Sequence, residues 1–102
     1  MEYINLTPHA INLNDGRTFQ PSGTIARVSA GFSAIEDDVC VQTFGDVSGL
    51  PEATDGVRYI VSGLVLSALV GRRDDVVAPA TGHPDCQRNS KGHIVSVPCF
   101  VR

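Results

Sequence analysis

The strongest constraint on the fold of this chain is a ten-residue segment in its second half, Ser62 to Gly71. Serine suits the position before a helix and glycine the position after one, and residues 63–70 between them are apolar on nearly every side. A helix without a polar face is expected to be buried. Residues 57–61 and 76–79 flank it and are rich in strand-forming side chains, so the segment predicts a strand–helix–strand unit, right-handed if its strands are parallel.

The rest of the chain is typical of short strands separated by turns. Asn14-Asp15-Gly16 and Pro21-Ser22-Gly23 are turn signals, and Pro98 marks an edge or a bulge in the last strand. Alternating or β-rich runs predict strands at residues 2–6, 10–13, 24–29, 39–44 and 93–101, with residues 30–38 as a loop or ragged hairpin connection. We therefore expect a single α+β domain over residues 1–102: one small mixed β-sheet with one principal buried helix.

The composition is ordinary for a folded domain, with 42% apolar and 19% charged residues. A net charge of −3 argues against a DNA or RNA polymer as a partner, because such partners are normally bound by a basic face. The start of the chain lacks a basic and apolar leader, and no apolar stretch is long enough to span a bilayer, so we expect a cytoplasmic protein without a membrane partner. The three cysteines, at positions 40, 86 and 99, are expected to be reduced thiols.

Thr7-Pro8-His9 interrupts the strand pattern near the start of the chain. Proline fixes its own backbone and favours an extended residue before it, so the tripeptide is a rigid kink with a hydroxyl and an imidazole. Two interpretations remain open. Thr7 and His9 satisfy backbone groups at a bulge, or His9 donates to or takes a proton from a ligand.

Two further segments carry polar groups that suit an anion. Ser62-Gly63 opens the predicted helix, where free backbone N–H groups bind phosphate; an N-cap serine beside a packing glycine is the alternative. Arg72 precedes a predicted strand and could clamp a phosphate while Asp74 orients it or binds a ribose hydroxyl. A surface cluster of ion pairs is the alternative for this second segment.

Four possible zinc ligands, His83, Cys86, His93 and Cys99, have the spacing H-x2-C-x6-H-x5-C, which matches no zinc module that we can name. We predict no metal and no cofactor, although the sequence alone does not decide whether these four residues bind a metal. No G-x-S-x-G motif and no cysteine in a catalytic setting is present, so nothing favours nucleophilic catalysis.

Five stretches in order, "NLTPHAINL", "PSGTIARV", "YIVSGLVLSAL", "RRDDVVAPATG" and "GHIV", resemble small proteins encoded by bacteriophages. Compact phage proteins of this size often counter host defence. One such group acts as sponges, oligomers that sequester cyclic nucleotides or cyclic ADP-ribose-type immune signals. By analogy, the resemblance implies an anti-defence protein in the host cytoplasm.

Three hypotheses follow. The first is a homo-oligomer that binds a small nucleotide-derived signal without cleaving it, with Tyr59 or Phe100 as an apolar wall and the apolar segment 94–101 as a sheet edge covered by a partner subunit. The second is a metal-independent phosphodiesterase with His9 as acid or base, and with Thr7 and either Arg27 or Arg72 stabilising charge. It lacks a clear second acid–base group, so we favour binding over catalysis. The third is a protein-interaction module. The residues predicted to bind the ligand are Thr7, His9, Arg27, Ser62, Gly63, Arg72 and Asp74.

Overall fold

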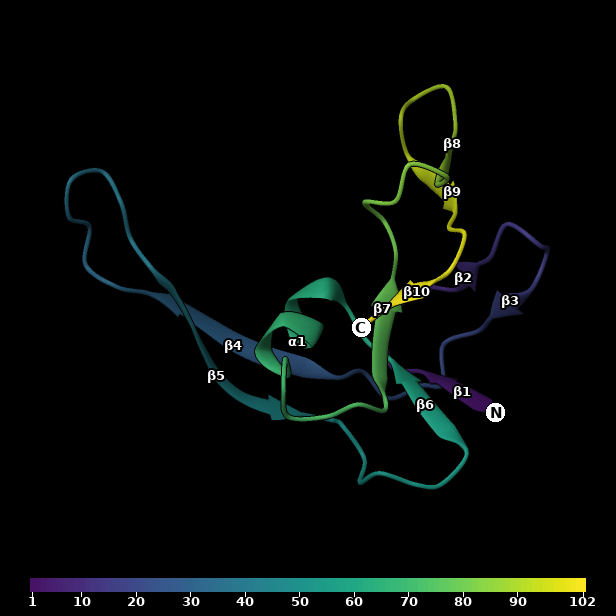
Figure 1. Ribbon diagram of the computed structural model, residues 1–102, viewed down its shortest axis with the longest axis horizontal. Helices are drawn as coiled ribbons and strands as arrows, with labels where there is room; N and C mark the ends of the chain where they lie inside the picture. The colour runs from purple at the N-terminus through teal and green to yellow at the C-terminus, as the bar shows by residue number, and fades with distance from the viewer.

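A computed structural model describes residues 1–102 and shows one mixed sheet, one short helix and three two-stranded ribbons (Figure 1). The elements are β1 Glu2–Asn5, β2 Ile11–Asn12, β3 Thr18–Phe19, β4 Arg27–Phe32, β5 Gln42–Ser48, β6 Val57–Ile60, α1 Gly63–Ala68, β7 Val76–Pro79, β8 Gln87–Arg88, β9 Ile94–Ser96 and β10 Phe100–Val101. The four-stranded sheet has the order β1-β6-β7-β10, in which β1, β6 and β7 are parallel and β10 is antiparallel to β7. The ribbons are β2–β3, β4–β5 and β8–β9.

The strand–helix–strand unit is present as β6, α1 and β7, and its strands are parallel neighbours. The mixed sheet confirms the α+β prediction in outline, but the helix is much smaller than expected. It ends at Ala68, and Val65 is its one buried residue, while Leu64 and Val70 are 44% and 73% exposed. A helix of six residues has fewer than two turns, so it presents only one narrow stripe to the sheet and leaves its other apolar side chains in solvent.

The two faces of the sheet are buried under different parts of the chain. On the face covered by α1, Tyr59 and Val61 pack with Val65, Leu69 and three further buried residues, Leu6, Ala26 and Val76. On the opposite face, Ile60 packs with Val77 of the neighbouring strand β7 and with three residues from outside the main sheet, Ile11, Leu13 and Val97. Successive residues of a strand point to opposite faces, so one short apolar run supplies both clusters.

Three aromatic rings close the edge of the second cluster. Tyr3 lies 5.3 Å from Phe19 and 5.4 Å from Phe100, measured between ring centroids, and Phe19 lies 5.5 Å from Phe100. Such edge-to-face and offset contacts stabilise aromatic clusters beyond the area that they bury. Phe100 is therefore occupied by packing within the fold, and Tyr59 is 3% exposed.

The predicted last strand is divided into two. β9 pairs with β8, and β10 pairs with the edge of the main sheet through Phe100 opposite Pro79. Val97 lies between them and bridges to Leu13, so the chain changes partner just before Pro98. Proline cannot donate to a ladder, which agrees with a break at this point.

The ribbon β4–β5 is a long hairpin that projects from the body of the molecule (Figure 1). Val28 and Val47 at its base pack against the cluster on the α1 side of the sheet. The outer part, residues 30–44, includes the loop expected from the sequence and lies away from α1. We call this outer part the arm.

None of the three cysteines is paired in a disulfide: Cys40 and Cys99 are exposed and Cys86 is half-buried. The molecule has no helix with the length and apolarity needed to cross a membrane.

Two glycines with the same backbone conformation provide a test of packing at the base of the hairpin. Gly49 and Gly56 both have φ of +78°, but a methyl group on Gly49 would collide with the backbone carbonyl of Ile25, whereas one on Gly56 meets nothing within 4 Å. We expect Gly56→Ala to lower the free energy of unfolding by about 1 kcal/mol, from backbone strain alone, and Gly49→Ala by about 3 kcal/mol. Urea denaturation measures both, and equal losses would contradict this packing.

Candidate functional site

The Thr7-Pro8-His9 corner is organised by the side chain of Asn5, which is 2% exposed. The Asn5 Nδ2 group donates to the backbone carbonyls of His9, at 2.8 Å, and Phe19, at 3.0 Å. Its Oδ1 atom accepts from the backbone N–H of Thr7 at 2.9 Å and from the Thr7 hydroxyl at 2.6 Å. One buried amide thus satisfies the backbone polar groups on both sides of the kink, as buried polar groups require.

Thr7 has a structural role in this network. The residue is 9% exposed, and its hydroxyl also lies 3.0 Å from the carbonyl of His9. The imidazole of His9 is exposed and forms no hydrogen bond; only the backbone carbonyl of this residue is used. None of the five main pockets is lined by Thr7, His9 or Arg27. The structure therefore does not bring these three residues together with the other predicted ligands.

Ser62 and Gly63 lie at the other end of α1 from Arg72. The Ser62 hydroxyl accepts from the backbone N–H of Val65 at 3.3 Å, which is the N-cap contact. Gly63 lines a pocket of about 440 Å³ between α1 and the loop after β7, without an arginine. Ser62 therefore acts as a helix cap in this structure, and the two residues are separated from the other predicted phosphate ligands.

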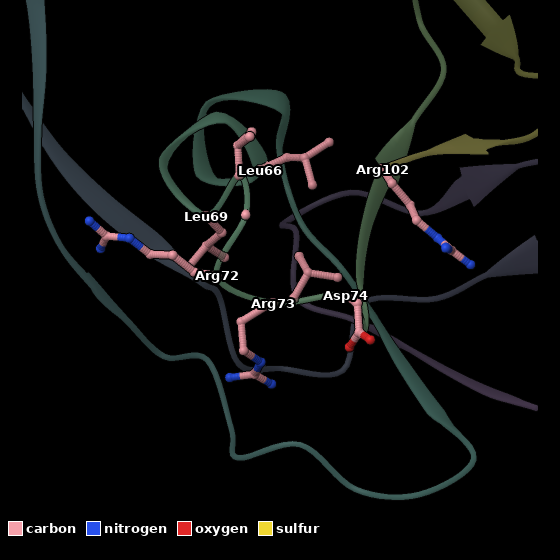
Figure 2. Close-up of a pocket in the computed structure, with 9 residues that line it drawn as sticks. Leu66, Leu69, Arg72, Arg73, Asp74 and Arg102 are labelled. Atoms are coloured by element: carbon pink, nitrogen blue, oxygen red, sulfur yellow. The ribbon is translucent and has the colours of Figure 1, made fainter.

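Arg72 and Asp74 do share a pocket, of about 560 Å³, at the C-terminal end of α1 (Figure 2). We call it the α1–β7 pocket. It is lined by Leu66, Leu69, Val70, Gly71, Arg72, Arg73, Asp74, Val76 and Arg102. Gly71, two residues beyond the C-cap Leu69, has φ of +76°, and the Arg72 N–H donates to the carbonyl of Leu69 at 2.9 Å. This tight turn directs the following residues to the rim of the pocket.

Arg73 holds the loop between α1 and β7 in place. Its guanidinium donates two hydrogen bonds to the carboxylate of Asp75, at 2.8 and 2.7 Å, and one to the carbonyl of Pro51 at 3.1 Å. Figure 2 shows this side chain directed away from Leu66 and Leu69. Hydrogen bonding to Arg73 lowers the pKa of Asp75, and the same contact raises the pKa of Arg73. Arg73 is therefore engaged within the fold rather than free for a ligand.

Arg72 and Arg102 are different, because neither forms an ion pair or a side-chain hydrogen bond. In Figure 2 their guanidinium groups extend in opposite directions, away from each other, with Asp74 between Arg73 and Arg102. Arg102 was not among the predicted site residues. It follows β10, which pairs with β7, so only that long-range pairing places it beside Asp74. No local sequence signal could have identified it.

The groups that line the α1–β7 pocket are suited to an anion. Two unpaired guanidinium groups, one carboxylate and an apolar wall line it, and it contains no imidazole. The three histidines do not converge elsewhere: only His83 lines one of the five main pockets, and its Nδ1 atom accepts from the backbone N–H of Asp85 at 3.0 Å. No three histidine, cysteine or acidic side chains cluster as metal ligands, and Cys86 donates to the carbonyl of Ala80.

Comparison with known proteins gives no relative: no protein-family model matches the chain, and no curated protein or solved structure is significantly similar to it.

The network around Asn5 leads to a paired test of the corner. Asn5→Ala removes the amide that forms four hydrogen bonds, and it leaves buried backbone groups unpaired. We therefore expect the free energy of unfolding to fall by about 3 kcal/mol. His9→Ala keeps the backbone carbonyl and removes only an exposed ring, so we expect a change of no more than about 0.5 kcal/mol. Both are measured by urea denaturation; a larger loss for His9→Ala would overturn this assignment.

The Arg73–Asp75 pair makes a prediction about pH. Because folding lowers the pKa of Asp75 below its ordinary value of 3.8, the pair stabilises the fold fully above that value and loses its effect as the pH falls through the folded-state pKa. Asp75→Asn is expected to cost about 2 kcal/mol of unfolding free energy near pH 7, and the difference from the unmodified chain should shrink toward about pH 2. Thermal unfolding at a series of pH values measures it; a difference independent of pH would contradict the ion pair.

Proposed function

We propose that the protein binds a small phosphate-bearing ligand in the α1–β7 pocket and retains it without cleaving it. The observation that carries the proposal is the pair Arg72 and Arg102, two guanidinium groups without a carboxylate partner at the same pocket. Guanidinium groups bind phosphate oxygens through paired, charge-assisted hydrogen bonds, and here no ion pair has to be broken first.

The remaining lining groups suit the other parts of a nucleotide-like molecule. Leu66 and Val70 offer an apolar surface for a base, and Val70 is 73% exposed. The Asp74 carboxylate forms no ion pair in the structure and can accept hydrogen bonds from ribose hydroxyl groups. A volume of about 560 Å³ is in the usual range of small-molecule sites.

Retention without cleavage is the simpler activity for this set of residues. General acid–base catalysis needs groups that can both take and return a proton at the scissile bond, and the pocket has a single carboxylate and no imidazole. Together with the resemblance to phage proteins, this supports sequestration of a nucleotide-derived immune signal, of the cyclic nucleotide or cyclic ADP-ribose type, in the host cytoplasm. Tyr59 and Phe100 are not needed in this arrangement, because both are packed within the fold.

Native mass spectrometry with a panel of cyclic nucleotides and ADP-ribose derivatives tests the proposal. We expect one ligand to add its intact mass and to be released unchanged on denaturation. Arg72→Ala and Arg102→Ala should each weaken binding about 10- to 100-fold, the loss of one charge-assisted contact.

Arg88→Ala is the matched control, because it removes the same charge from an exposed arginine that donates to the carbonyl of Gly92 and lines none of the five main pockets. Its affinity should stay within about twofold of the unmodified chain. A ligand recovered as product would replace sequestration with hydrolysis. Equal losses in all three variants would show that binding follows net charge and not this pocket.

A further inference from the structure

The molecule exposes more surface than a compact chain of its size. Its accessible area is 6755 Å², whereas a monomer of 10.8 kDa is expected to have about 5,500 Å². The radius of gyration is 15.1 Å against about 13 Å for a compact domain of 102 residues. The excess of roughly 1,200 Å² is larger than the roughly 800 Å² that each partner buries in a standard protein–protein interface.

The arm stands out from the body in Figure 1. Its large apolar side chains are exposed: Phe32 by 70%, Ile35 by 76%, Val39 by 64%, Val41 by 63% and Phe44 by 39%. A two-stranded hairpin in water is marginally stable on its own, so an arm of this kind is expected to gain stability from a covering surface.

The register of the hairpin gathers the two phenylalanines on one face. Ala30 lies opposite Phe44, and Phe32, two residues further along β4, points to the same side. The other face carries Gly31 opposite Thr43. One face of the arm therefore carries both phenylalanines beside Gln42, and the opposite face is small and polar apart from the exposed Val41.

The face with both phenylalanines is continuous with a face that the core already covers. At the base of the hairpin, Val28 lies opposite Val47, and both pack against the cluster that includes Val65 of α1. The six residues of α1 are about 9 Å long, whereas the six residues of β4 span about 20 Å. The helix covers the base, and the outer part of the same face is left bare.

We propose that a second copy of this chain covers the arm, with the faces formed by Ala30, Phe32 and Phe44 of the two copies packed together in a two-fold symmetric dimer. The two arms run antiparallel. Each tip carries Glu36, Asp37 and Asp38, so parallel arms would place six like charges together, while antiparallel arms separate the tips. Each acidic tip then lies toward the base of the partner's arm and away from the partner's own acidic tip.

A two-fold arrangement uses the same patch on both copies, so one apolar face is enough to close the assembly. The segment 94–101, which the sequence suggested as a subunit contact, is less suited to this role. Val97 is buried within the chain, and β10 already pairs with β7. The dimer does not depend on a bound ligand.

Sedimentation velocity of the full chain without ligand tests the proposal, with an expected mass of twice 10.8 kDa. The double variant Phe32→Ser/Phe44→Ser should raise the dimer Kd at least about 100-fold, because it removes the centre of the interface from both copies. Val95→Ser is the matched control: it changes a residue that is 50% exposed but lies on β9, outside the arm, and should leave the Kd within about twofold.

A second variant, Ala30→Glu, shows whether loss of the dimer in the double variant comes from a folding defect. It adds a charge at an exposed position without removing core volume, so the circular dichroism spectrum should be unchanged while the dimer is lost. A monomeric unmodified chain at all concentrations would overturn the proposal. So would a dimer that survives both arm variants, or one that Val95→Ser alone disrupts. Loss of ligand binding with an intact dimer would count against the proposed function only.

Discussion

The structure depends on covering both faces of the parallel pair β6 and β7. Ile60 and Val61 are 0% exposed and point to opposite faces, so neither face of this pair can be left to solvent. Parallel strands are normally buried on both sides. Here a chain of 102 residues has only one short helix to cover one face. The other face is covered by Ile11 of β2 and by the segments around Leu13 and Val97. The small ribbons of the fold are a consequence of this need.

The elements that could be predicted from the sequence are those with a local cause. Ser62 marked the start of the helix because capping is a local interaction, whereas Gly71 lies two residues beyond the C-cap Leu69; the apolar runs of β6 and β7 identified the parallel pair. The length of α1 was overestimated because an apolar sequence alone does not show how much surface is available to cover it. Val70 is apolar and still exposed, since the helix has ended before it.

The contacts that hold the short ribbons in place could not be predicted from the sequence, because they join residues that are far apart in the chain. The Asn14 side chain accepts from the Ser96 hydroxyl at 2.6 Å, and its backbone N–H donates to Val97 at 2.9 Å. The candidate site likewise combines residues that could be predicted from the local sequence with one that could not. Arg72 and Asp74 are near neighbours in sequence and meet in one pocket, while Arg102 joins them only through the pairing of β10 with β7. Asn5 had a local signal, an amide two residues before Thr7, but the same residues also fit a strand pattern, which does not show that the amide is buried.

The short helix links the two exposed features of the molecule. Gly71 turns the chain directly after α1, which brings Arg72 to the rim of the α1–β7 pocket. The same early end leaves the outer face of the arm without a helix above it. One further turn of helix would lengthen α1 by about 5 Å, but it would also replace the turn that presents Arg72. The pocket and the bare apolar face therefore have a common physical origin, and a second copy of the chain can cover the arm without closing the turn at Gly71.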